Sequence, residues 1–261
     1  MLKSQEPAAS AIAPAPTAAP HEQSMAEPAL ARGYASALRS PRSHAILVVT
    51  AIVGLTTDLV TKYLAFDSLR WHRPKILIPK VLSLELSLNL GALFGIGKGM
   101  SMLFILASVL AVVFVAYMFA TSQRRQWVVH LALGLVLAGA LGNLYDRVFV
   151  KVALVTPAGA AHNAVPYMGT ITQVREDGSF QLGDYPDGRR NVRTLTGNAK
   201  VEARTAVRDF IRFDAAFREK DVWPWIFNFA DSMLVIGVGL LLLIYWRHPV
   251  APQGASPPAQ T

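Results

Sequence analysis

The chain has no cysteine among its 261 residues, and only 16% of them are charged. Without cysteine there is no disulfide bond, no thiolate metal site and no cysteine nucleophile. The low charged fraction, together with 52% hydrophobic residues, is typical of a small polytopic membrane protein and not of a soluble domain. The net charge of +8 does not by itself indicate a nucleic-acid partner, because basic residues in a membrane protein also set its orientation, and we expect no such partner.

The first residues lack the apolar core of a signal peptide, so none is expected there. Residues 1–43 are rich in alanine, proline and serine and show no hydrophobic period. This composition predicts a disordered tail. We expect a second disordered tail at residues 248–261 and one folded domain between the two, at residues 44–247.

Four apolar runs are long enough to span a bilayer: residues 45–66, 102–120, 127–145 and 223–245. Four spans put both termini on one side of the membrane. That side carries the arginines of the short flanking segments, so the positive-inside rule makes it cytoplasmic. Residues 67–100 contain short β-prone pieces that should lie outside the hydrocarbon. We therefore predict an all-α membrane protein with four transmembrane helices, a small extracytoplasmic β-containing region and a β-rich insertion.

The polar residues inside or beside these runs fall at one end of the predicted bundle, the outer leaflet. They are Asp58, Lys62, Asn89, Asn143, Asp146, Arg147, Asn228 and Asp231. An ionised aspartate near the centre of a membrane helix costs roughly 2.5 to 3.5 kcal/mol on insertion scales. The cluster is therefore a candidate functional site, with a helix-capping or packing role as the alternative for Asp231.

Spacing predicts the partners of some of these residues. Asp58 and Lys62 are four residues apart on one helix face, so they can pair, and Lys62 can also extend toward the membrane surface. Asp146 and Arg147 are adjacent and do not face each other. Arg147 could bind a carboxylate or a lipid phosphate, either as a structural clamp or as a substrate contact. Small residues every fourth position, at 134, 138 and 142, predict close helix packing.

Asp209 and Asp231 form the most specific candidate pair. Two carboxylates held close together share a proton near neutral pH, so one can act as a base toward water and the other as an acid. Such a pair hydrolyses a peptide bond without a metal or a covalent nucleophile. The sequence contains no GxSxG or HExxH motif, and the glycines from Gly91 to Gly97 do not have phosphate-loop spacing. A proton-coupled transporter is the alternative, but it would need polar residues at the midplane.

Five motifs in chain order together resemble bacterial lipoprotein signal peptidase, also called signal peptidase II, an aspartyl intramembrane peptidase. They are DLVTK (58–62), NLGALF (89–94), GNLYDR (142–147), VRDF (207–210) and FNFADS (227–232). The resemblance implies that Asp209 and Asp231 are the catalytic pair and that Asp58 and Lys62 are structural. The residues implied to orient this pair or hold substrate are Asn89, Gly91, Asn143, Asp146, Arg147, Asn228 and Ala230.

The resemblance also implies the reaction and its setting. Members of this family remove the signal peptide from prolipoproteins just before a diacylglyceryl-modified cysteine, and globomycin blocks them. We therefore expect a monomeric enzyme of the bacterial inner membrane with no metal or cofactor. Its partners would be prolipoproteins and membrane lipid, and its active site would lie at the outer leaflet.

The sequence departs from the family pattern between the third and fourth spans. About ten residues usually separate the two motifs there, whereas residues 148–208 intervene in this chain. Within this insertion, residues 168–182 have β-prone arms around Asp177 and Gly178, which predicts a β-hairpin. A tolerated surface loop and an added substrate-gating or partner-binding element both remain open.

Overall fold

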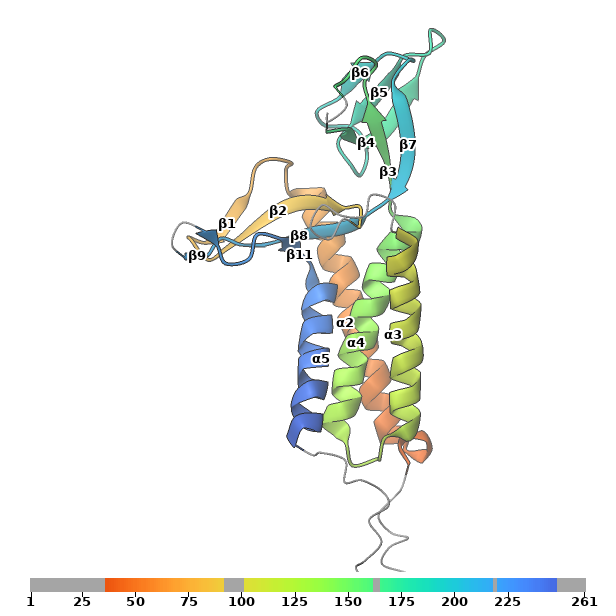
Figure 1. Cartoon of the computed structure of the whole chain (residues 1–261), viewed down its shortest axis with the longest axis vertical. Coiled ribbons are helices and arrows are strands. Elements are labelled where there is room, and N and C mark those ends of the chain that lie inside the picture. Colours follow the sequence, from red (N-terminus) through yellow and green to blue (C-terminus); the bar gives the residue numbers. More distant parts are fainter. Residues whose placement is uncertain (1–35, 92–100, 162–164, 218–219, 248–261) are drawn as a thin grey trace, which may run out of the picture. The chain divides into compact units, whose positions relative to one another are not determined.

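The computed structural model describes residues 36–91, 101–161, 165–217 and 220–247. Four long helices run side by side (Figure 1): α2 (Pro41–Ser68), α3 (Ser101–Thr121), α4 (Trp127–Phe149) and α5 (Phe229–Arg247). A short 3-10 helix, η1 (Ala37–Arg39), precedes α2. All four long helices have the length and composition needed to cross a membrane, so the prediction of four apolar helices able to span a bilayer is confirmed.

The helix starts differ from the predicted ones for identifiable reasons. α2 begins at Pro41, because Ser40 caps it: the Ser40 hydroxyl accepts a hydrogen bond from the Ser43 N–H at 3.3 Å. Residues 36–43 of the predicted tail are therefore ordered in η1 and α2, and both predicted tails otherwise lie outside the described residues. α5 begins at Phe229 and not at residue 223, because the residues just before it pair with a strand.

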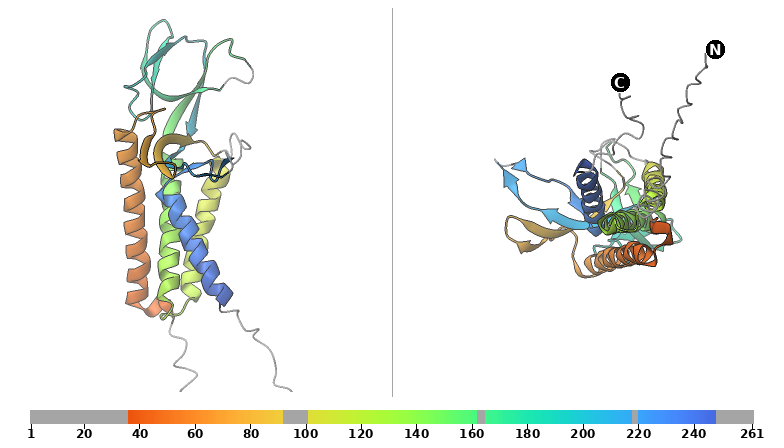
Figure 2. Two further views of the ribbon diagram at one scale, coloured as in Figure 1. Left: turned by 90° about the vertical axis from the view of Figure 1, so that its left-hand side faces the viewer. Right: turned by 90° about the horizontal axis from the view of Figure 1, so that it is seen from below.

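Helix α4 contacts each of the other three helices, and Figure 2 shows it between them. Its small residues permit this. A side chain at Gly134 would lie 2.7 Å from Cβ of Thr50 on α2, and a side chain at Gly142 would overlap the carboxylate of Asp58. The predicted small-residue stripe is confirmed as the surface against which α2 packs.

A four-stranded antiparallel sheet joins the helical bundle. Its order is β1 (Lys75–Ile78), β2 (Leu82–Asn89), β8 (Val207–Phe213) and β11 (Ile226–Phe227). In β2, Leu84, Leu86 and Leu88 alternate with polar residues, the period that puts one strand face on a core. Between β8 and β11 lie two short paired strands, β9 (Ala216–Phe217) and β10 (Lys220–Asp221). This sheet is the predicted β-containing region, extended by strands that follow the insertion.

The insertion itself forms a five-stranded antiparallel sheet of order β6-β5-β4-β3-β7. Its strands are β3 (Lys151–Thr156), β4 (Tyr167–Val174), β5 (Phe180–Gly183), β6 (Arg193–Leu195) and β7 (Lys200–Thr205). The predicted hairpin is confirmed: β4 pairs with β5, and Gly178 has a φ of 77° in the turn. The two sheets correct the all-α class, because strands form much of the described chain outside the four helices.

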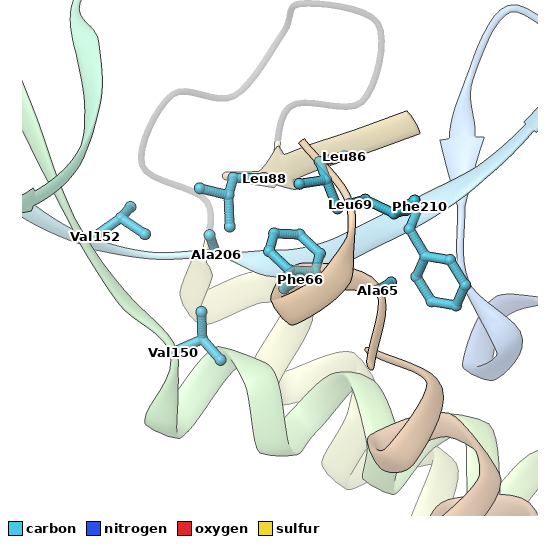
Figure 3. Close-up of a cluster of buried hydrophobic side chains, with 9 residues drawn as sticks. All are labelled: Ala65, Phe66, Leu69, Leu86, Leu88, Val150, Val152, Ala206 and Phe210. Carbon is cyan, nitrogen blue, oxygen red and sulfur yellow. The ribbon is translucent and has the colours of Figure 1, made fainter. Parts of the chain in front are cut away.

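Buried apolar side chains join α2, both sheets and the end of α4 (Figure 3). The cluster comprises Ala65, Phe66, Leu69, Leu86, Leu88, Val150, Val152, Ala206 and Phe210. Phe210 follows Asp209 directly, so burying its ring turns the preceding carboxylate to the opposite face of β8. The core thus sets the direction in which Asp209 points.

Candidate active site

Asn228 lies between β11 and α5 and caps the helix. Its Oδ1 accepts a hydrogen bond from the Asp231 N–H at 3.0 Å, and its own N–H donates to Oδ2 of Asp231 at 3.2 Å. These reciprocal bonds form a capping box, and a negative charge in the first turn also favours the helix dipole. Asp231 therefore has the capping role that the sequence left as an alternative. Asn228 was predicted inside the membrane helix, and that position is wrong.

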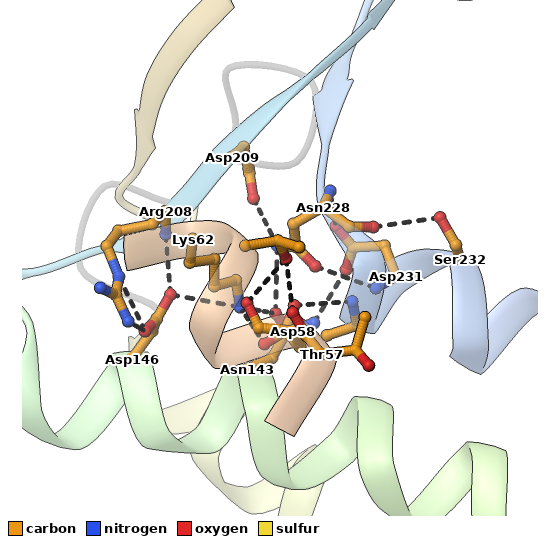
Figure 4. A network of polar contacts seen from close by, with 12 residues as sticks. Thr57, Asp58, Lys62, Asn143, Asp146, Arg208, Asp209, Asn228, Asp231 and Ser232 are labelled. Carbon is orange, nitrogen blue, oxygen red and sulfur yellow. Dashed lines mark hydrogen bonds and ion pairs between the residues drawn. The ribbon is translucent and has the colours of Figure 1, made fainter. Parts of the chain in front are cut away.

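Asp209 lies on β8 opposite Ser87 of β2 and is 2% exposed. Nδ2 of Asn228 donates a 2.6 Å hydrogen bond to Oδ1 of Asp209. Asn228 thus bonds both aspartates (Figure 4). Burial first, and then the negative charge of Asp231, raise the pKa of Asp209 to about 8. Asn228 therefore bonds both aspartates that the sequence analysis paired.

Asn143 of α4 orients the second carboxylate. Its Nδ2 donates to Oδ1 of Asp231 at 2.8 Å, while its Oδ1 accepts from Nδ2 of Asn228 and from Nζ of Lys62, both at 3.3 Å. With both donors on its oxygen, the amide can only present its NH₂ group to Asp231. Asn143 therefore fixes one rotamer of Asp231.

Lys62 is 0% exposed and points into the cluster. Its Nζ lies 2.8 Å from Oδ2 of Asp58 and 3.3 Å from Oδ2 of Asp146. The predicted pairing with Asp58 is confirmed, whereas the predicted extension of Lys62 toward the membrane surface is wrong. Partners on α4, far away in sequence, hold the ammonium group inside. Asp58 in turn accepts from the N–H of Ala230 at 2.9 Å, which connects α2 to the start of α5.

Arg208 is a charged partner that the sequence analysis did not single out. Its N–H donates to Oδ2 of Asp146 at 2.9 Å, and its Nε and Nη2 donate to Oδ1 at 3.1 Å and 2.7 Å. Asp146 is 0% exposed, so this buried contact fixes the start of strand β8 to α4. The sequence does contain one signal for this contact: a charged residue at the start of a largely buried strand indicates a partner of opposite charge.

Arg147 contacts the end of β2. Its Nη1 donates to the carbonyl oxygen of Asn89 at 3.0 Å, and its guanidinium lies 5.0 Å from the ring centre of Phe104. Asn89 accepts from the N–H of Gly91 at 2.9 Å. Gly91 has a φ of 90°, and a side chain there would crowd Phe104. These contacts let Arg147 clamp α4 to the end of β2 and to α3.

The cluster contains three cationic and four carboxyl side chains. They are Lys62, Arg147 and Arg208, and Asp58, Asp146, Asp209 and Asp231. A single proton on the carboxyl groups therefore makes it neutral, in agreement with the raised pKa of Asp209. No group of three or more His, Asp or Glu side chains suited to hold a metal ion occurs among the residues that the structure describes.

At one end of four helices of membrane-spanning length, Asn228 bonds two carboxyl groups, the arrangement expected of an intramembrane peptidase of the aspartic type. The family follows from the sequence match: the model described as signal peptidase (SPase) II matches residues 50–247, most of the chain. The chain belongs to the signal peptidase II family. With its four apolar helices, this membership indicates a protein of the bacterial inner membrane.

Individual relatives agree. The chain is 29% identical over 167 residues to the lipoprotein signal peptidase of Desulfitobacterium hafniense, covering 64% of this chain and 70% of the relative. It is 45% identical over 104 residues to that of Rhodococcus jostii, covering 40% and 52%. For Rhodopirellula baltica the values are 28% over 219 residues, 81% and 76%. A solved bacterial membrane enzyme superposes with a TM-score of 0.50 at 23% identity, covering 80% of this chain and 93% of that one, which shows the shared fold.

Proposed function

We propose that this enzyme removes signal peptides from diacylglyceryl-modified prolipoproteins, with water activated between Asp209 and Asp231. The observation that carries this proposal is the pair of hydrogen bonds by which Asn228 holds both carboxyl groups. An amide that bonds both groups keeps them on one shared spot, where a water molecule and a peptide carbonyl can meet. The family and the names of the relatives support the substrate class.

The reaction needs one base and one acid. Asp209, whose pKa is raised to about 8, carries the proton at neutral pH, and Asp231 is the base. Asp231 takes a proton from water as the water oxygen adds to the scissile carbonyl carbon, and Asp209 protonates the carbonyl oxygen. Asp231 then gives its proton to the leaving nitrogen while Asp209 takes one back from a hydroxyl group of the tetrahedral intermediate, and the C–N bond breaks. The products are the signal peptide carboxylate and a free amino group on the lipid-modified cysteine.

The surrounding residues orient the pair and the substrate. Asn143 fixes Asp231, and the Ala230 N–H bonded to Asp58 fixes the helix that carries it. Asn89 is exposed at the end of β2 and lies beside Gly91. A substrate helix must unwind to be cut, because helical hydrogen bonds occupy its carbonyl groups. Asn89 and the backbone at Gly91 would form hydrogen bonds with the backbone groups that the substrate frees on unwinding. Arg147 would hold Asn89 in place.

The proposed orientation puts both termini in the cytoplasm and the site at the outer leaflet. The basic residues of the short flanking segments support this orientation. A substrate with acyl chains on its cysteine then keeps those chains in the bilayer while the peptide bond next to them reaches the aspartates. This arrangement accounts for an enzyme whose active site lies at the end of a helical bundle.

Incubation of the purified protein with a diacylated prolipoprotein tests the proposal. We expect release of the signal peptide by the wild type, and a loss of at least about 10³-fold for Asp209→Asn and Asp231→Asn. Both substitutions keep hydrogen-bonding side chains of nearly the same shape, so the variants should fold. Substantial cleavage by either variant would remove the proposed pair, and transport without cleavage by the wild type would favour the proton-coupled transporter.

A further inference from the structure

The insertion contacts the helix that carries Asp58 and Lys62. Its residues 184–191, the docking loop, lie between β5 and β6. The ring of Tyr185 packs edge-on against Phe66 near the end of α2, with centroids 5.8 Å apart. The carbonyl oxygen of Tyr185 accepts a 3.1 Å hydrogen bond from Nε1 of Trp71. Arg190 donates to the carbonyl oxygen of Leu69, the C-cap of α2, at 3.3 Å.

The docking loop is hydrogen-bonded to its own sheet, so its position relative to that sheet is fixed. The N–H of Asp184 donates to the carbonyl oxygen of Arg190 at 2.8 Å, and Nδ2 of Asn191 donates to Oδ2 of Asp184 at 2.6 Å. The hydroxyl of Thr170 on β4 donates to the carbonyl oxygen of Pro186 at 2.9 Å. These bonds close the loop on itself and fix it to β4.

Residues 58, 62 and 66 of α2 recur every fourth position, so they lie on one helix face. The face that Tyr185 packs against is therefore the face that presents Asp58 and Lys62 to the active site. Tyr185 also senses the charges of Arg208 and Asp146, although burial is the main cause that raises the pKa of its hydroxyl. The docking loop thus adjoins the end of α2, the helix that presents Asp58 and Lys62 to the cluster around Asp209.

We propose that the docking loop is a positioning element of the active site, which holds the C-terminal end of α2 and thereby keeps Lys62 and Asp58 beneath the two aspartates. The inference rests on the proposed peptidase function. It assigns to the insertion a role in catalysis through α2 and not in substrate contact. Tyr185 is its central positioning residue.

Two matched variants test this role. Tyr185→Ala removes the ring from Phe66, whereas Tyr167→Ala removes a ring of the same insertion that packs against Arg193. We expect about a tenfold fall in kcat with little change in KM for Tyr185→Ala, wild-type behaviour for Tyr167→Ala, and recovery in Tyr185→Phe. If Tyr185→Ala does not fold, the pair Arg190→Met and Arg189→Met gives the same comparison, because the Arg189 side chain is 85% exposed.

The pH profile separates positioning from simple loss of folded enzyme. The charge of Lys62 lowers the pKa of Asp209, so a displaced Lys62 should move the pH–rate curve of Tyr185→Ala to higher pH. Asp58 lies on the same helix and would move with Lys62. The other charged groups of the cluster, Asp146, Arg147, Arg208 and Asp231, lie on other elements and should stay in place. A lower rate with an unmoved curve, or wild-type kinetics, would overturn the inference.

Hydrogen exchange gives a readout that needs no activity. Exchange at residues 65–69 should be faster in Tyr185→Ala than in Tyr167→Ala, because the docking loop no longer covers this end of α2. Equal exchange in both variants would also overturn the inference. If exchange differs between the two variants as expected but the wild type cleaves no diacylated prolipoprotein, the proposed function fails while the contact between the loop and α2 stands.

Discussion

The Asp146 carboxylate accepts hydrogen bonds from the backbone N–H and from the guanidinium group of Arg208. A residue of α4 thus holds the strand residue that directly precedes Asp209. The insertion separates these two residues by a whole five-stranded sheet. Their contact closes that excursion at its base. The start of β8, next to Asp209, is thereby fixed to α4.

Removing Asp146 should destabilise the protein more than removing Arg208. Asp146→Ala leaves Lys62 and Arg208 without a shared counter-charge, and breaking a buried pair in this way costs about 3 to 5 kcal/mol. Arg208→Ala leaves Asp146 paired with Lys62 at 3.3 Å. Thermal unfolding in detergent should rank the midpoints accordingly. Glu202→Ala, at a surface pair with Lys200, serves as the control and should leave the midpoint unchanged; the opposite ranking would contradict the network.

Gly142→Ala should impair both stability and cleavage. A methyl group there would overlap the Asp58 carboxylate and approach Cβ of Ala230 to 3.2 Å, so we expect a cost of about 1 to 3 kcal/mol and displacement of Asp58. Gly239→Ala is the matched control, since a side chain at Gly239 of α5 meets nothing within 4 Å. Its unfolding midpoint should stay equal or rise, because alanine favours a helix. Equal effects of the two substitutions would contradict this packing.

Asp209 should make stability depend on pH. Its pKa is 3.8 in the unfolded chain and about 8 in the fold, so the folded state binds more protons between these values. The stabilising contribution is complete below about pH 4 and is lost as the pH rises through about 8. The unfolding midpoint should therefore fall from pH 5 to pH 8 in the wild type and less steeply in Asp209→Asn, measured by tryptophan fluorescence. Parallel curves would contradict the raised pKa.

The two roles of Asp231 should separate in two substitutions. Asp231→Asn keeps an oxygen to accept from the Asn228 N–H, whereas Asp231→Ala removes it and costs the cap about 1 kcal/mol. Both variants should lose cleavage, and only Asp231→Ala should also unfold at a lower temperature. Equal midpoints would mean that the capping box does not stabilise α5.

Local patterns predict much of this molecule. Apolar runs predict the four helices, alternating leucines indicate β2, and the turn residues at 177 and 178 predict the hairpin of the insertion. The N-x-x-D spacing from Asn228 to Asp231 would also have predicted the helix start, but the apolar run extends back to Trp223 and hides it. Ile226 and Phe227 pair with β8, so the helix cannot extend back to Trp223. No local pattern predicts this strand pairing.

The residues predicted less well depend on partners far away in sequence. Lys62 lies in a membrane-spanning run, which predicts extension toward the surface, yet Asn143 and Asp146 on another helix bind its ammonium group in addition to Asp58. The partner of Arg208 is also distant in sequence. The acidic residue that binds it lies 62 positions earlier, beyond a sheet that single-sequence patterns cannot position.

The capping box has a consequence for the timing of biosynthesis. Asp231 lies in the first turn of α5 and is also the second carboxyl group of the proposed pair. Under the proposed mechanism, a nascent chain that has inserted only its first three helices therefore has no hydrolytic centre. Cleavage would become possible only once the last helix has inserted, so the emerging polypeptide would be spared premature cutting.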